Sequence, residues 1–199
     1  MEAARAMFDA AVAGDLGGVQ RALDGGVDPN ALVHIEKAGG KYAGGKYEGT
    51  ALVRAAFNGQ LEVAALLLDR GASPDKPDSF GFTPLMKAAN HGHAAVVGLL
   101  LERGADLTAT NPRGATAFHF ACAANQPGCV EALVRTDCDM AAKTKDGRTG
   151  KMMAEAEGNT EVLERLRDLV VERLGEASRE AACYGNLLVP FPLSQSATC

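Results

Sequence analysis

The sequence predicts an all-α solenoid of about five helix-turn-helix repeats, and three observations support this prediction. Glycine markers recur every 33 residues, a leucine-rich stretch recurs in the same register, and alanine and glycine together supply 59 of the 199 residues. Repeats of this length indicate stacked helical units. So many small side chains suit helices that pack very closely, and they do not suit a β-sandwich.

Several independent markers keep the 33-residue register. The stretch 63–68 aligns with 96–101, and both are rich in valine and leucine. The glycine markers form three series, which are Gly59, Gly92 and Gly158, then Gly71 and Gly104, then Gly81, Gly114 and Gly147.

The copy at 81–113 shows the expected layout of one repeat. Thr83 can cap the first helix through its hydroxyl group, and the proline after it suits a first helical turn. The alanine pair that begins at Ala88 lets a neighbouring helix approach closely. Gly92 can end the first helix with a positive φ, and a leucine-rich second helix then runs to Gly104.

Carried along the chain, this register predicts a repeat domain over residues 1–174 and a partly disordered extension over 175–199. A 12-residue insertion follows the first repeat and lies at about 35–47. The predicted repeats cover approximately residues 1–34, 48–80, 81–113, 114–146 and 147–174.

The outer copies and the fourth copy depart from the pattern. The first copy starts at Glu2 as a polar N-terminal cap, and the charged stretch Glu161–Leu174 is expected to cap the other end. In the fourth copy Asn125 and Asp137 replace the two glycines and Pro127 is added. We therefore expect both turns of that copy to be distorted.

The insertion contains a tandem duplication, Ala38–Tyr42 followed by Ala43–Tyr47, and is expected to form a flexible or hairpin-like finger. Gly40, Gly45 and Lys46 mimic the start of a phosphate-binding loop. However, Tyr47 stands where a magnesium-binding Ser or Thr belongs, and no buried strand precedes it, so we reject nucleotide binding. The insertion is either a solvated loop or a contact loop that grips a partner through its tyrosines and lysines.

The C-terminal extension does not continue the repeat. Residues 176–183 are expected to add one or two helical turns. The apolar stretch Leu187–Leu193 contains two prolines, which forbid a helix. It either folds back on the last repeat, is disordered, or serves as a short binding segment, and residues 194–199 are expected to be disordered.

Composition excludes several classes of protein and of site. The apolar runs are too short for a membrane span, Glu2 argues against a signal peptide, and a net charge of −5 argues against a general nucleic-acid binder. Five cysteines without a C-x-x-C pair indicate a reducing compartment, cytoplasmic or nuclear. His119 and Cys122 are better explained as buried structural residues than as a metal half-site, so no metal or cofactor is expected.

Catalysis is not expected either. The four histidines lie in no hydrolase or metalloprotease motif, and an open groove does not exclude water as catalytic sites require. We predict that the chain is not an enzyme and has no small-molecule substrate.

The repeat resembles the ankyrin repeat. The resemblance rests on Gly81-Phe-Thr-Pro-Leu-Met-Lys-Ala-Ala-Asn-His-Gly and on Val96-Val-Gly-Leu-Leu-Leu-Glu-Arg-Gly-Ala-Asp106, and it covers about residues 3–174. It implies a curved ankyrin-repeat solenoid with β-hairpin or loop fingers at right angles to the helices. It also implies a structural role for His119, which in this family ties neighbouring fingers together by hydrogen bonds.

The resemblance further implies that the chain binds another protein through the concave face formed by the fingers and first helices. Five of the ten aromatic residues lie in the insertion or at such positions of copies two and three, and four of the transferred residues are basic. We therefore expect a partner segment that is apolar with acidic flanks, lying across copies two and three. The transferred positions are Tyr42, Lys46, Tyr47, Phe57, Asn58, Ser79, Phe80, Phe82, Asn90, His91, Arg113, Ala115, Lys145 and Arg148.

Two alternatives remain open. Phe80 and Phe82 could instead cover the neighbouring finger, with Phe57 packed under the insertion. The chain could also be a permanent structural subunit of a larger assembly rather than an adaptor or scaffold.

Overall fold

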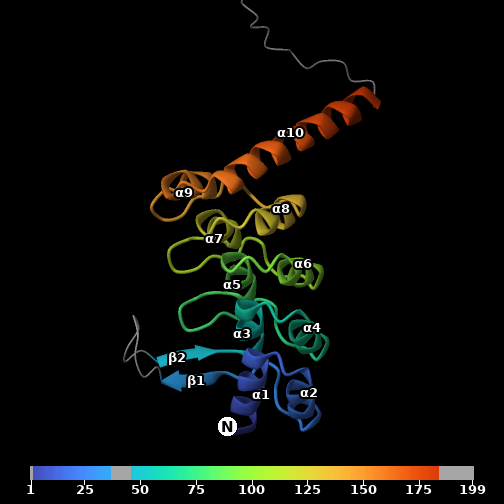
Figure 1. The fold of residues 1–199 in the computed structure, drawn as a ribbon, viewed down its shortest axis with the longest axis vertical. Coiled ribbons are helices and arrows are strands. Elements are labelled where there is room, and N and C mark those ends of the chain that lie inside the picture. The colour runs from blue at the N-terminus through green and yellow to red at the C-terminus, as the bar shows by residue number, and fades with distance from the viewer. Residues whose placement is uncertain (1, 37–45, 184–199) are drawn as a thin grey trace, which may run out of the picture.

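The computed structural model describes residues 2–36 and 46–183, which form ten helices and one two-stranded antiparallel sheet. The predicted all-α repeat solenoid is confirmed. Figure 1 shows the first helices of the repeats stacked in one column and the second helices in another, with the fingers on the opposite side. The first helices are α1 (Glu2–Ala13), α3 (Ala51–Asn58), α5 (Pro84–Asn90), α7 (Ala117–Ala123) and α9 (Gly150–Glu157). The second helices are α2 (Leu16–Asp24), α4 (Leu61–Asp69), α6 (Ala94–Glu102), α8 (Pro127–Arg135) and α10 (Thr160–Cys183).

Threonine caps begin the first helices at the predicted spacing. The hydroxyl oxygens of Thr50, Thr83 and Thr149 each accept a hydrogen bond of 3.3 Å from the backbone N–H three residues further on. Each cap satisfies an N–H group that has no partner within the helix.

The turns of the fourth copy are regular, so the distortion expected there is wrong. Asn125 and Asp137 have φ angles of 53° and 61°, in the same left-handed region as Gly59 at 71°. Asn and Asp tolerate this region better than other residues with a side chain. Pro127 is the first residue of α8, where its missing N–H costs no helical hydrogen bond.

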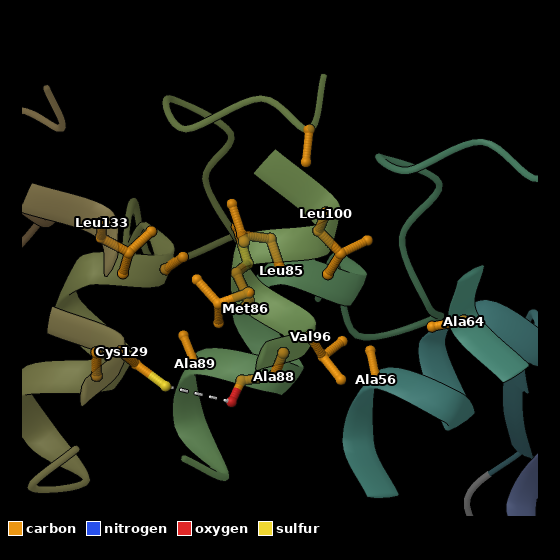
Figure 2. Packing of buried hydrophobic residues seen from close by; sticks show 14 of the residues in the cluster. Ala56, Ala64, Leu85, Met86, Ala88, Ala89, Val96, Leu100, Cys129 and Leu133 are labelled. Atoms are coloured by element: carbon orange, nitrogen blue, oxygen red, sulfur yellow. Dashed lines mark hydrogen bonds between the residues drawn. The ribbon is translucent and has the colours of Figure 1, made fainter. Parts of the chain in front are cut away.

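The core is a thin layer that continues from repeat to repeat (Figure 2). In α5, the fully buried Leu85, Met86 and Ala89 pack among side chains of the neighbouring repeats. The small Ala88 allows close approach, and its carbonyl oxygen accepts a 4.0 Å hydrogen bond from the Cys129 thiol of α8. The alanines singled out in the sequence therefore lie where the repeats meet.

The two ends of the insertion form a hairpin. Strand β1 (Val33–Glu36) pairs with β2 (Lys46–Gly49), with Ile35 opposite Tyr47. Val33 and Tyr47 join Phe8 of α1 in a small second cluster. The loop between the strands, 37–45, lies outside the described residues, so the prediction about its flexibility is not tested.

Helix α10 continues past Leu174 to Cys183, so the helical turns predicted for residues 176–183 are present, and it runs past α8 away from the stack (Figure 1). It is held to α8 by Arg173, whose guanidinium donates to the Val134 carbonyl at 2.8 Å. The division into a repeat domain and an extension stays a prediction. The apolar stretch 187–193 and the end of the chain lie outside the described residues.

Candidate functional site

Each finger after the hairpin is built on one polar side chain at a fixed position of the repeat. The Asp78 carboxylate accepts hydrogen bonds from the N–H groups of Phe80 (3.0 Å) and Phe82 (2.9 Å). Asn111 accepts the equivalent pair in the next finger, at 3.0 Å each. In the last finger Thr144 accepts the equivalent of the second bond, at 3.2 Å. Side chains at the finger tips are therefore carried on a repeated, hydrogen-bonded turn.

Asp78 also anchors its finger, the first after the hairpin, to helix α5. Its side chain is 0% exposed and lies 3.0 Å from the Lys87 ammonium of α5. The same ammonium lies 4.0 Å from the ring centroid of Phe82, a cation–π distance. Phe82 also packs against Phe120 of α7, with 5.2 Å between centroids. Phe82 is therefore half-buried and fixed in position before any partner arrives.

Tyr47 was expected to be exposed for a partner, and this expectation is wrong. Its side chain is only 5% exposed because β2 turns it onto Phe8 of α1, with 6.5 Å between the ring centroids. The absence of a side chain at Gly49 leaves room for the phenol, which a Cβ there would strike. Burial, followed by the nearby charge of Asp78, raises the pKa of Tyr47 to about 12. This tyrosine is part of the fold at the root of the hairpin.

Arg54 of α3 links this buried cluster to the surface. Its guanidinium lies 5.8 Å from the ring centroid of Tyr47 and 4.8 Å from that of Phe57. Phe57 in turn packs against the exposed His91 at 4.1 Å. The ring of His93 bonds to the Phe57 carbonyl oxygen at 3.0 Å, which holds the end of α3 against the next repeat. Phe57 thus packs largely on Arg54 and His91, and it stays partly accessible.

Phe80 is the most exposed aromatic of this face among the described residues. Its side chain is 41% exposed, although its ring lies only 6.1 Å from that of Tyr47. Phe80 therefore fits both alternatives, because one side of its ring covers the hairpin and the other side is exposed to solvent.

Exposed cations follow the aromatic residues along the fingers. Arg113, Lys145 and Arg148 are exposed, and none of them makes an ion pair within the part of the chain that the structure describes. The N–H of Lys145 donates to the Arg113 carbonyl at 2.9 Å, so the tips of adjacent fingers lie side by side.

The remaining predicted site residues contribute less or lie outside the description. Asn58 donates a 3.4 Å hydrogen bond to the Val12 carbonyl of α1, and Asn90 lies within 3.5 Å of the His91 ring. Tyr42 is outside the described residues, and only the backbone of Lys46 is described. We define the finger face as Phe57, Phe80, Phe82, His91, Arg113 and Arg148.

Comparison with known families agrees with this architecture. A model of three ankyrin repeats matches residues 7–111, and a model of a single ankyrin repeat matches residues 113–145. The chain belongs to the ankyrin-repeat family. Ankyrin repeats are generally protein–protein interaction modules and are typically not enzymes. A search of the curated proteins gives no significant match.

His119 has the structural role that the ankyrin resemblance implied. Its Nδ1 accepts the N–H of Thr116 at 3.2 Å, which closes a capping box at the start of α7. Its Nε2 bonds to the Arg148 carbonyl of the next finger at 3.3 Å. Burial lowers the pKa of His119, with the hydrogen bond to Arg148 acting in the opposite direction.

A second series of inter-repeat contacts was missed in the sequence. The residue directly after each mid-repeat turn reaches back to the corresponding turn of the previous ankyrin repeat. His93 does so through the Phe57 carbonyl, and Asn159 donates to the Cys122 and Ala123 carbonyls at 2.8 and 3.0 Å. Their common 33-residue spacing was the available signal. We call Gln60, His93, Gln126 and Asn159 the clamp residues.

Other kinds of site find no support in residues 2–36 and 46–183. No three His, Cys, Asp or Glu side chains gather there as potential metal ligands. No described helix is both long and apolar enough to cross a membrane.

Proposed function

We propose that this chain is a non-enzymatic adaptor that binds a segment of another protein on its finger face. The observation that carries the proposal is the sequence of side chains along that face. Partly exposed rings of Phe57, Phe80 and Phe82 are followed by Arg113 and Arg148, which have no ion-pair partner among the described residues.

The chemistry of the face favours a partner that is apolar with an acidic flank. Aromatic side chains at a pre-formed surface contribute much of the energy of protein interfaces, often about 2 kcal/mol or more each. Cations without an intramolecular partner favour acidic groups and speed association. Because Tyr47 is buried, the apolar contact is proposed for Phe57, Phe80 and Phe82 rather than for the hairpin tyrosine.

The proposal includes a reducing compartment, cytoplasmic or nuclear. Cys122, Cys129 and Cys138 are buried free thiols, and burial raises their pKa to about 12, 11 and 11. They are therefore suited to packing rather than to disulfide exchange. No nucleic acid, membrane or small molecule is part of the proposed function.

A permanent subunit of a larger assembly is the second candidate, and a feature at the other end of the stack favours it. Met152, Val170 and Val171 are 51%, 41% and 64% exposed. Val170 and Val171, together with Arg167, line a hollow of about 380 Å³ between α9 and α10. Such a patch is typical of a surface covered by another subunit.

Two matched triple variants test the two candidates. The face variant is F80S/H91S/R113E, and the end variant is M152S/R167E/V171S, which makes the same change of charge. Both should keep the helical circular dichroism and melting temperature of the parent protein. Partners captured from cells and identified by mass spectrometry should be lost with the face variant and kept with the end variant. If partners are lost with the end variant alone and light scattering shows an oligomer, the adaptor proposal is wrong and the chain is a subunit of a larger assembly.

A further inference from the structure

The second helices α4 and α6 lie on the side of the stack opposite the fingers (Figure 1). A second hollow lies between them. Its volume is about 600 Å³. Helix α4 contributes Leu61, Glu62 and Ala65, and helix α6 contributes Ala95, Gly98, Leu99 and Glu102. Its floor is therefore apolar and made mostly of small side chains, with one glutamate from each helix.

The same positions carry charge further along the stack. Where α6 has Gly98, α8 has Glu131, and where α6 has Leu99, α10 has Arg165. Glu131 and Arg165 form an ion pair of 2.9 Å that spans α8 and α10. The corresponding positions of α4 and α6 are Ala65 and Leu99, which carry no charge, so no such ion pair crosses the middle of the groove.

Packing within the stack does not require a glycine at position 98. A Cβ built on Gly98 meets no atom within 4 Å, and its φ lies outside the left-handed region. A glycine in the middle of a helix lowers helix stability relative to alanine. Gly98 therefore lowers the stability of α6 without improving its packing, and it leaves the floor of the groove free of a side chain.

The charges of the groove lie at its two ends. Glu62 is in the first turn of α4 and Glu102 is the last residue of α6. The ion pair of Asp69 with Arg103, at 2.6 Å, joins the C-terminal ends of the two helices, which therefore run in parallel. Glu62 is the second residue of its helix and Glu102 the ninth of the other, so their positions are seven residues apart along the helix axes, about 11 Å. Both glutamates are exposed, and neither makes an ion pair with a described residue.

We propose that this groove binds a short amphipathic helix of a partner protein. The apolar stripe of that helix packs over Ala65, Ala95 and Gly98. Two basic residues of the partner, two turns apart at positions i and i+7, pair with Glu62 and Glu102, because two turns cover about 11 Å. This site is separate from the finger face, so the chain can hold two partners at once.

The test uses two labelled synthetic helical peptides and fluorescence anisotropy. Both peptides carry the same Leu/Ala stripe, with lysines at i and i+7 in one and glutamates in the other. The lysine peptide should bind saturably and at least about tenfold more tightly than the glutamate peptide. The double variant E62K/E102K should reverse this preference.

Gly98→Glu, which copies Glu131 of α8, should weaken binding of the lysine peptide at least about tenfold without lowering the melting temperature. Gly128→Glu makes the same change on α8, outside the groove, and should bind like the parent protein. The face variant F80S/H91S/R113E should also bind like the parent, so failure of the proposed function and failure of this inference are distinguishable.

Equal affinity for the two peptides, or unchanged binding by Gly98→Glu, would overturn the proposal. Sedimentation of the protein alone tests the other possible occupant of the groove, a second copy of the chain. Self-association that Gly98→Glu abolishes would show that a second copy of the chain, and not a partner helix, fills the groove.

Discussion

At the scale of single residues, His119 joins the start of α7 to the next finger through one neutral ring. It closes the cap of α7 at Thr116 and binds the Arg148 carbonyl of the next finger. Both bonds need the neutral tautomer, in which Nδ1 accepts and Nε2 donates. Protonation therefore removes the acceptor and places a charge in a buried site.

This arrangement predicts a loss of stability in mild acid. Because burial lowers the pKa of His119 below its ordinary 6.5, the unfolded chain takes up the proton first as the pH falls. The contribution is complete above pH 6.5 and decreases as the pH falls through the pKa of the folded state. The urea midpoint should be lower at about pH 5.5 than at about pH 7.5.

His119→Gln should reduce this pH dependence, because glutamine also completes a capping box but does not titrate. His91→Gln, on an exposed ring, is the matched control and should retain it. An equal pH dependence of the His119→Gln variant and the parent would show that other groups are responsible.

Tyr47 shows which residue-scale properties the sequence could not predict. Its aromatic character and its place in the insertion were visible, but its burial depends on Phe8, which lies far away in the chain. Repeat register predicts exposure only where the backbone follows the repeat, and here the hairpin replaces it. Phe80 and Arg113, which lie on regular fingers, are exposed as the register predicted.

At the scale of elements, glycines with two different roles can be distinguished. Gly59 ends α3 with a φ of 71°, and the ring of His93 occupies the space where a Cβ would lie. Gly98 sits inside α6 with open space around it. The first glycine is required by the turn, whereas the second is not required by the fold.

We therefore expect opposite effects from the same substitution. Gly98→Ala should raise the free energy of unfolding by about 0.5–1 kcal/mol, because alanine favours the helix. Gly59→Ala should lower it by about 1 kcal/mol or more, through the strained φ and the contact with His93. Urea denaturation of both variants gives the comparison, and a stabilised Gly59→Ala variant would contradict this assignment.

The helices of the fourth copy end where the repeat predicts, because the residues that replace its glycines adopt the same backbone conformation. Asn125 and Asp137 keep the turns of the glycines they replace, which the sequence alone did not resolve. The repeat register predicted the start of α10, whereas its helical turns over residues 176–183, which lie beyond the repeat, were predicted separately from the register.

At the scale of the whole molecule, the core is one-dimensional, and each repeat contacts only its neighbours. Leu67 of α4 lies between repeats, whereas Leu166 of α10 lies in the last described repeat. Either leucine-to-alanine change should cost about 2–5 kcal/mol locally.

The extent of the damage should differ between these two variants. Leu166→Ala should raise hydrogen exchange in α9 and α10 and leave α1 to α4 unchanged, because only one neighbour depends on it. Leu67→Ala should raise exchange on both sides of α4. Uniform loss of protection throughout the chain in both variants would mean that the solenoid unfolds as one unit.

The clamp residues give the stack a direction. His93 and Asn159 each bond to the repeat that precedes them in the chain. A ribosome makes the earlier repeat first, and nascent chains fold from their N-terminal parts onward. Each newly made repeat therefore finds the carbonyl groups that receive its clamp already in place, so the protein can be assembled in the order in which it is translated.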